Sequence, residues 1–181
     1  MLTDWHDFYI LLGTASAALV ALLFVAASIG TGLISAQRSV ATRTYMSPII
    51  FHYTFVLFLS LMALVPDMTD RALAAIATIV ALAGIAFSVA VLIGVVRSGA
   101  SDLADRFGYG GSPLAAYAAA LAAAGFLFAR SPIGPNVLAG ALVLLLIVNI
   151  RNAWDLMITF VQRHTDGTPL PPIPPPQAGE G

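Results

Sequence analysis

The sequence contains no cysteine and no lysine, and only 9% of its 181 residues are charged. Without cysteine, the chain cannot form disulfides, thiolate metal sites or cysteine nucleophiles. Soluble domains carry about 25% charged residues, so this chain has too few polar side chains to cover a globule in water. The formal net charge of -1 also gives no basic surface for nucleic acid.

Hydrophobic residues are what the chain has in excess, since they make up 59% of it. No charged residue occurs between Phe8 and Gln37, a stretch longer than the roughly 20 apolar residues that a helix needs to cross a bilayer. Asp4 and Asp7 precede this stretch without any basic residue, so we interpret it as a retained span rather than a signal peptide. The composition predicts an all-α, polytopic transmembrane helical bundle with the lipid bilayer as its partner.

Polar turns divide the predicted bundle, residues 1–163, into about five spans. Residues 34–46 are expected to form a polar connection, after which Ser47-Pro48 opens the second span, because Ser favours the N-cap and Pro the first helical position. Asp67 and Asp70 are expected to cap the third span. The predicted spans are 7–32, 47–65, 71–96, 112–129 and 134–157.

Five spans place the two termini on opposite sides of the membrane. With the N-terminus outside, the inner segments hold six of the eight arginines and the outer segments hold Arg71 and Arg130, so the sequence predicts a cytoplasmic C-terminus. The fourth and fifth segments could instead form a re-entrant hairpin, which would put the C-terminus outside. The tail, residues 164–181, contains six prolines and is expected to be extended and disordered.

Small residues recur at helical spacing in two of the predicted spans. Gly13, Ala17 and Ala21 are four residues apart, and Gly84 and Ser88 form a similar pair. Small residues at this spacing allow two membrane helices to approach closely. We therefore predict that these residues pack helices together, and we expect a homo-oligomer or a membrane-protein partner.

A second candidate site is polar. Polar residues of the fifth span, among them Asn149, Asn152 and Asp155, share one helix face. Arg151 and Asp155 are four residues apart and can form an ion pair. His52 is predicted at the same membrane depth, on the cytoplasmic side. The alternative is that the helix leaves the hydrocarbon near Asn149 and that His52 is an interfacial residue bonded to a neighbouring helix. The candidate polar cluster consists of His52, Asn149, Arg151, Asn152 and Asp155.

No metal, cofactor or catalytic site is predicted. A divalent metal could use His6 with nearby carboxylates, but Asp4, Asp7, Asp67 and Asp70 are already explained as residues that start helices. His6 and His52 are expected at opposite faces of a bilayer roughly 30 Å thick, so one chain cannot use both as haem ligands.

The first predicted span also carries a resemblance. Trp5-His6-Asp7-Phe8, then Gly13, then Leu22-Leu23-Phe24-Val25-Ala26 before Ser28, resembles the first helix of a family of small multi-spanning bacterial inner-membrane proteins of unassigned function. The resemblance covers mainly residues 4–30. It implies a bacterial cytoplasmic membrane and carries over no catalytic residues.

We therefore interpret the chain as a non-enzymatic structural or accessory membrane component that assembles through small-residue helix faces. The alternative is a small transporter or channel that uses the polar cluster. A membrane redox or enzyme subunit is a third hypothesis, although an enzyme usually shows more converging polar residues.

Overall fold

The computed structural model describes residues 2–31, 38–97 and 110–165. A 3-10 turn, η1 (Leu2–Trp5), leads into the first of five α-helices in this part of the chain. The helices are α1 (His6–Thr31), α2 (Arg38–Ala63), α3 (Asp70–Arg97), α5 (Ser112–Phe128) and α6 (Gly134–Thr165). The predicted all-α fold is confirmed.

Three helices are long and apolar enough to cross a membrane, over His6–Ala26, Asp70–Ile93 and Gly134–Asp155. The apolar parts of α2 and α5, Pro48–Ala63 and Ser112–Phe128, are shorter. The chain is therefore a helical, multi-pass membrane protein with about three candidate spans. Helix length alone establishes fewer spans than the five predicted from the sequence.

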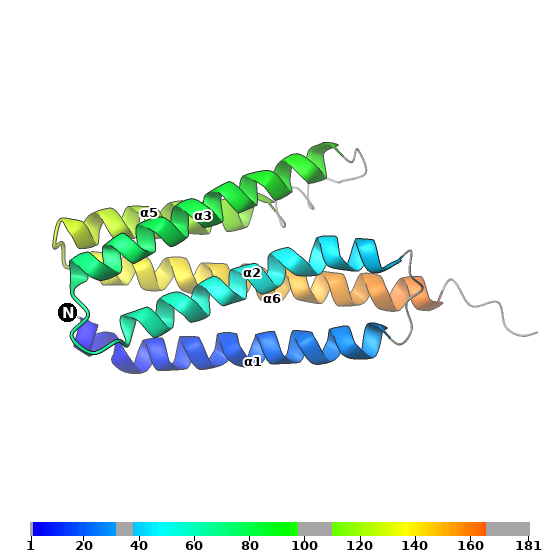
Figure 1. The fold of residues 1–181 in the computed structure, drawn as a ribbon, viewed down its shortest axis with the longest axis horizontal. Coiled ribbons are helices and arrows are strands. Elements are labelled where there is room, and N and C mark those ends of the chain that lie inside the picture. The colour runs from blue at the N-terminus through cyan, green and yellow to red at the C-terminus, as the bar shows by residue number, and fades with distance from the viewer. Residues whose placement is uncertain (1, 32–37, 98–109, 166–181) are drawn as a thin grey trace, which may run out of the picture.

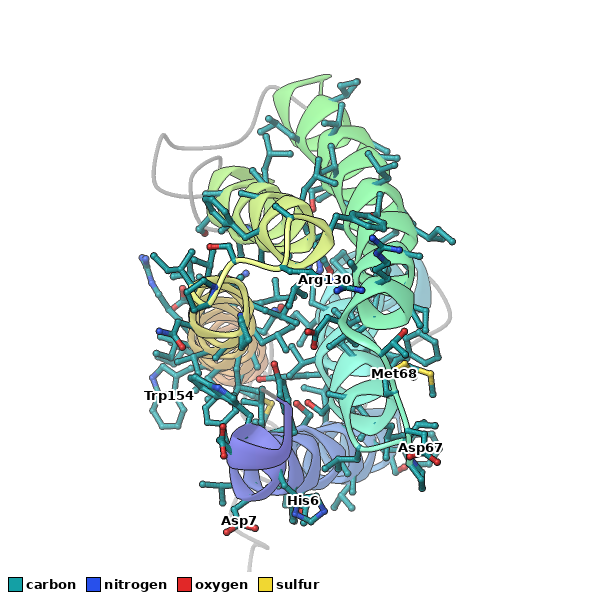
Figure 2. The ribbon with its side chains drawn as sticks, turned by 90° about the vertical axis from the view of Figure 1, so that its left-hand side faces the viewer. His6, Asp7, Asp67, Met68, Arg130 and Trp154 are labelled. Carbon is teal, nitrogen blue, oxygen red and sulfur yellow. The ribbon has the colours of Figure 1, made fainter. Side chains whose placement is uncertain are left out.

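The helices lie side by side in a bundle (Figure 1). Helix α1 forms one side, α2 and α6 lie in the middle, and α3 and α5 form the other side, an order that the end-on view of Figure 2 also shows. Helix α1 packs on α2, α2 on α6, α6 on α5, and α5 on α3. Helices α2 and α6 are therefore central, with α1 on one side of them and α3 and α5 on the other.

A tight turn joins α5 to α6 and is held by backbone hydrogen bonds. The N–H of Ser131 donates to the carbonyl of Phe126 at 2.9 Å, and the N–H of Arg130 donates to that of Leu127 at 3.0 Å. This pair of bonds requires a left-handed residue after the helix, usually glycine, and here Arg130 fills that place with φ 56°. The turn directs α6 back along α5.

The predicted start of the second helix is wrong. Helix α2 begins at Arg38, within the segment expected to be a polar connection, and Pro48 lies inside it. A proline removes one backbone hydrogen bond and crowds the preceding turn. Neighbouring groups in a packed membrane helix can compensate for that loss, so Pro48 does not end the helix.

The cap of α3 also differs from the expectation. The backbone N–H of Ala72 donates to Thr69 Oγ1 at 3.2 Å, so Thr69, rather than Asp67 or Asp70, supplies the side-chain cap. Asp70 is the first residue of the helix, where its charge favours the positive end of the dipole. Asp67 lies in the preceding turn with φ 57°.

Helix α6 runs to Thr165, and its candidate span, Gly134–Asp155, ends close to residue 157, the predicted end of the fifth span. The predicted disordered tail at 164–181 therefore begins inside this helix, and its remaining residues, 166–181, lie outside the described residues.

Helices α3 and α5 pack closely on each other, and alanine is the commonest buried residue on both. None of these alanines is more than a few per cent exposed. The residues are Ala74, Ala77 and Ala81 on α3 and Ala116, Ala120, Ala123 and Ala124 on α5. Such small side chains let the two backbones come close, which is how membrane helices gain contact energy.

Gly84 extends this interface by one turn, and its missing side chain is necessary there. A Cβ placed on Gly84 would overlap the ring of Tyr117. We expect Gly84→Ala to lower the free energy of unfolding by about 1–3 kcal/mol, because overpacking forces the ring or a helix to move. Thermal unfolding in detergent, followed by helical circular dichroism, measures the change.

Gly140→Ala is the matched control. Gly140 also lies inside a helix, but it is exposed and a Cβ there would meet nothing within 4 Å. Alanine should leave stability unchanged or raise it by up to about 1 kcal/mol, since it is the better helix former. Equal effects of the two substitutions would contradict the assigned role of Gly84.

Candidate functional site

The most distinctive polar contact lies inside the bundle. Nδ1 of His52 on α2 and Oη of Tyr117 on α5 are 2.7 Å apart, and both residues are 2% exposed. The tyrosine O–H donates when the ring proton is on Nε2, and the ring N–H donates when it is on Nδ1. His52 is therefore buried within the bundle and has a hydrogen-bond partner from another helix, α5.

Aromatic rings surround this pair. The His52 ring lies 5.9 Å from that of Phe87 on α3 and 5.5 Å from that of Tyr117, between ring centroids. Phe55 meets the Tyr117 ring edge-on at 5.4 Å. Because Gly84 leaves room for the Tyr117 ring, the close contact of α3 and α5 positions the hydroxyl that His52 binds.

Two amides of α6 are also buried. Asn149 is fully buried, and its Nδ2 donates to the carbonyl of Leu145, one turn earlier, at 2.6 Å. Asn152 is 3% exposed. Buried amides are costly in a membrane unless they are bonded, so intramembrane polar residues mark functional sites by default.

The charged members of the predicted cluster lie elsewhere. Nε of Arg151 and Oδ2 of Asp155 are 3.8 Å apart, but these side chains are 67% and 48% exposed, on the outside of the bundle. Trp154 between them points away from the bundle (Figure 2), as a residue at the membrane interface would. The structure thus buries His52, Asn149 and Asn152 and places the ion pair at the surface, where it stabilises little.

Several other buried polar atoms have no hydrogen-bond partner. Among the described residues these atoms are Tyr9 Oη, Ser16 Oγ, Tyr53 Oη, Ser88 Oγ and Asn149 Oδ1. All five residues lie inside the bundle, on α1, α2, α3 and α6. Such atoms are rare in dry protein interiors, so they are candidates for contact with a ligand.

The predicted packing residues divide into two groups. Gly13 and Gly84 lie at contacts within the chain, since a Cβ on Gly13 would be 3.3 Å from Cβ of Ser60 on α2. Ser88 is buried one turn beyond Gly84. Ala17 and Ala21 are exposed, so no helix in the described part of the chain covers them.

The acidic residues near the N-terminal end of α1 do not converge. His6, Asp7 and Asp67 all lie at this end of the bundle, with their side chains pointing outward at separate places (Figure 2). His6 Nδ1 and Asp7 Oδ1 form an exposed contact of 3.3 Å. Within the described ranges, no group of three His, Asp or Glu side chains is placed to hold a metal ion.

Sequence reasoning missed Tyr117, Tyr53 and Ser16. Tyr117 is the one hydroxyl-bearing residue between Pro113 and Ala129, a run of otherwise apolar and mostly small residues, and that contrast was the available signal. Tyr53 and Ser16 stand next to other polar or small residues, so the sequence contains no comparable signal for them.

A double-mutant cycle can measure the interaction energy between His52 and Tyr117. Tyr117→Phe alone leaves His52 without its partner and should lower the free energy of unfolding by about 1–3 kcal/mol. His52→Leu leaves the tyrosine hydroxyl unpaired. The double variant should lose less than the sum, with a coupling of about 0.5–3 kcal/mol, measured by unfolding in detergent. Additive losses would show that the two side chains do not interact.

No protein-family model, curated protein or solved structure matches the chain. The resemblance of residues 4–30 to small multi-spanning bacterial inner-membrane proteins therefore stays a prediction.

Proposed function

We propose that the protein is a non-enzymatic, five-span component of a bacterial cytoplasmic membrane that assembles with a second copy of itself through the outer face of α1. One observation carries this proposal. The exposed side of α1 presents a band of small residues, Thr14, Ala17, Ala18 and Ala21. Small residues facing outward permit a second helix to pack closely, and helix association in lipid depends on such contact.

Five spans are supported by the packing of the two shorter helices. Helices α2 and α5 each pack against helices that contain a candidate span. The 17 residues of α5 extend about 25 Å at 1.5 Å per residue, slightly less than the hydrocarbon thickness. Because both helices run alongside longer ones (Figure 1), we place all five in the membrane.

The arginines support the proposed orientation, with the N-terminus outside. Arg71 is the second residue of α3 and Arg130 lies just after α5, so both lie at the end of the bundle where α1 begins. Arg38 and Arg97 are the terminal residues of α2 and α3 at the opposite end, together with the last turns of α6. The basic excess lies at that second end, which is the cytoplasmic side by the positive-inside rule.

A second candidate function is a small transporter or channel. The observation that favours it is the buried polar set of His52, Asn149 and Asn152, which a purely structural bundle does not need. Polar residues inside membrane bundles commonly line substrate or ion pathways.

The assembly hypothesis predicts different effects for substitutions on the outer face of α1 and for a substitution at its contact with α2. Ala17→Leu with Ala21→Leu should convert the oligomer to monomer without loss of thermal stability, because both side chains are exposed. Gly13→Leu should instead destabilise the chain itself, since Gly13 packs on Ser60. Native mass spectrometry from mild detergent gives the oligomer size.

Ala86→Leu, the same substitution at an exposed position of α3, is the control and should leave the oligomer intact. A monomeric native protein, or an oligomer unaffected by Leu at positions 17 and 21, would refute assembly through this face. An added mass from a different protein would redirect the proposal to a heterologous partner.

The transport hypothesis predicts flux in liposomes for a panel of monovalent cations and small neutral solutes. Asn149→Leu should abolish flux, because it removes a buried amide from the interior. Asp155→Asn should leave flux unchanged, since Asp155 lies at the outer surface. Native protein with no flux above that of empty liposomes for every member of the panel would exclude this function.

A further inference from the structure

The unpartnered buried polar atoms are not spread evenly through the bundle. Of the five in the described part of the chain, four lie on α1, α2 and α6, and only Ser88 Oγ lies on α3. The four are Tyr9 Oη, Ser16 Oγ, Tyr53 Oη and Asn149 Oδ1. A hydroxyl or amide that is shielded from water and unbonded is costly, so their concentration along one group of helices requires a physical explanation.

Packing shows where Ser16 faces. Helix α1 packs on α2 and touches α6, so the covered side of α1 faces these two helices. Ser16 is 0% exposed and lies on this side, one turn before Leu19 and Val20. Its hydroxyl is therefore enclosed where α1 meets α2 and α6.

Tyr53 and Asn149 reach the same region from the other two helices. Tyr53, with Leu23 and Ile49, forms a buried cluster against which Leu19 and Val20 of α1 and Leu146 and Ala153 of α6 pack. Asn149 is three residues after Leu146 and four before Ala153, so the three share one face of α6. Because Asn149 is fully buried, its amide lies at the level of this cluster.

We propose that Ser16, Tyr53 and Asn149 line a hydrated pocket between α1, α2 and α6, whose ligand is water. The two hydroxyls can donate or accept and the amide oxygen can accept, which matches a molecule that does both. All three groups are uncharged, so they suit an uncharged ligand. A buried water makes about three hydrogen bonds to otherwise unbonded groups.

The interior of the bundle then differs from one side to the other. Where α3 packs on α5, the buried residues are mostly alanine and other apolar residues, whereas the region between α1, α2 and α6 holds water. Tyr9, on the covered side of α1 nearer its first turn, continues the polar line toward the N-terminal end. This inference does not rest on the proposed assembly, because the pocket lies within one chain.

The absence of cysteine from the sequence permits a direct test in the otherwise native chain. We expect Ser16→Cys and Asn149→Cys to react with a water-borne methanethiosulfonate on the order of tenfold faster than Ala77→Cys, because only the hydrated thiolate reacts and a thiol in apolar surroundings is inert. Ala77 of α3 is equally buried, lies in the apolar core cluster and is the matched control. Equal rates at the three positions would overturn the proposal.

Tyr53→Phe gives a second measurement that does not depend on cysteine variants. The substitution removes one hydroxyl and little volume. If water bonds the hydroxyl, its loss lowers the thermal midpoint of unfolding. If the hydroxyl is dry and unbonded, removing it leaves the midpoint unchanged or raises it, because an unsatisfied polar group disappears. The first result supports the hydrated pocket and the second overturns it.

Discussion

Helices in a bilayer gain little by burying apolar side chains from lipid, which is itself apolar, so the bundle depends on close contact between small residues. The alanine rows of α3 and α5 provide that contact, and Gly84 carries it one turn further. At Gly84 the missing side chain makes room for the Tyr117 ring. The hydroxyl of that ring then meets His52, so the buried polar bond is a consequence of backbone proximity.

Helix α2 places two polar side chains that are adjacent in sequence on different flanks of the bundle. His52 faces α3 and α5 and is bonded, whereas Tyr53 faces α1 and α6 and has no protein partner. Successive residues of an α-helix are about 100° apart around its axis, so one helix can serve two environments. The bonded side provides rigidity, and the unbonded side provides the groups that a small polar ligand would meet.

The sequence was sufficient to predict helices and their approximate positions, because uncharged runs of this length have few alternatives in a membrane. It could not predict partners. Arg151 and Asn152 are adjacent, yet one is exposed and the other buried, and only packing against α2 and α5 decides which side of α6 is covered. Pro48 shows a related limit, because a proline is a local start signal and α2 nevertheless begins ten residues before it, at Arg38.

The small-residue stripe of α1 shows the same limit in geometric terms. A spacing of four residues advances about 40° beyond a full turn, because the helix has 3.6 residues per turn. Gly13, Ala17 and Ala21 therefore drift around the helix, from a buried position against α2 to the exposed surface. In this stripe, Gly13 therefore makes a contact inside the chain, whereas Ala17 and Ala21 face outward. A single helix can in this way stabilise its own chain and remain available to a second copy.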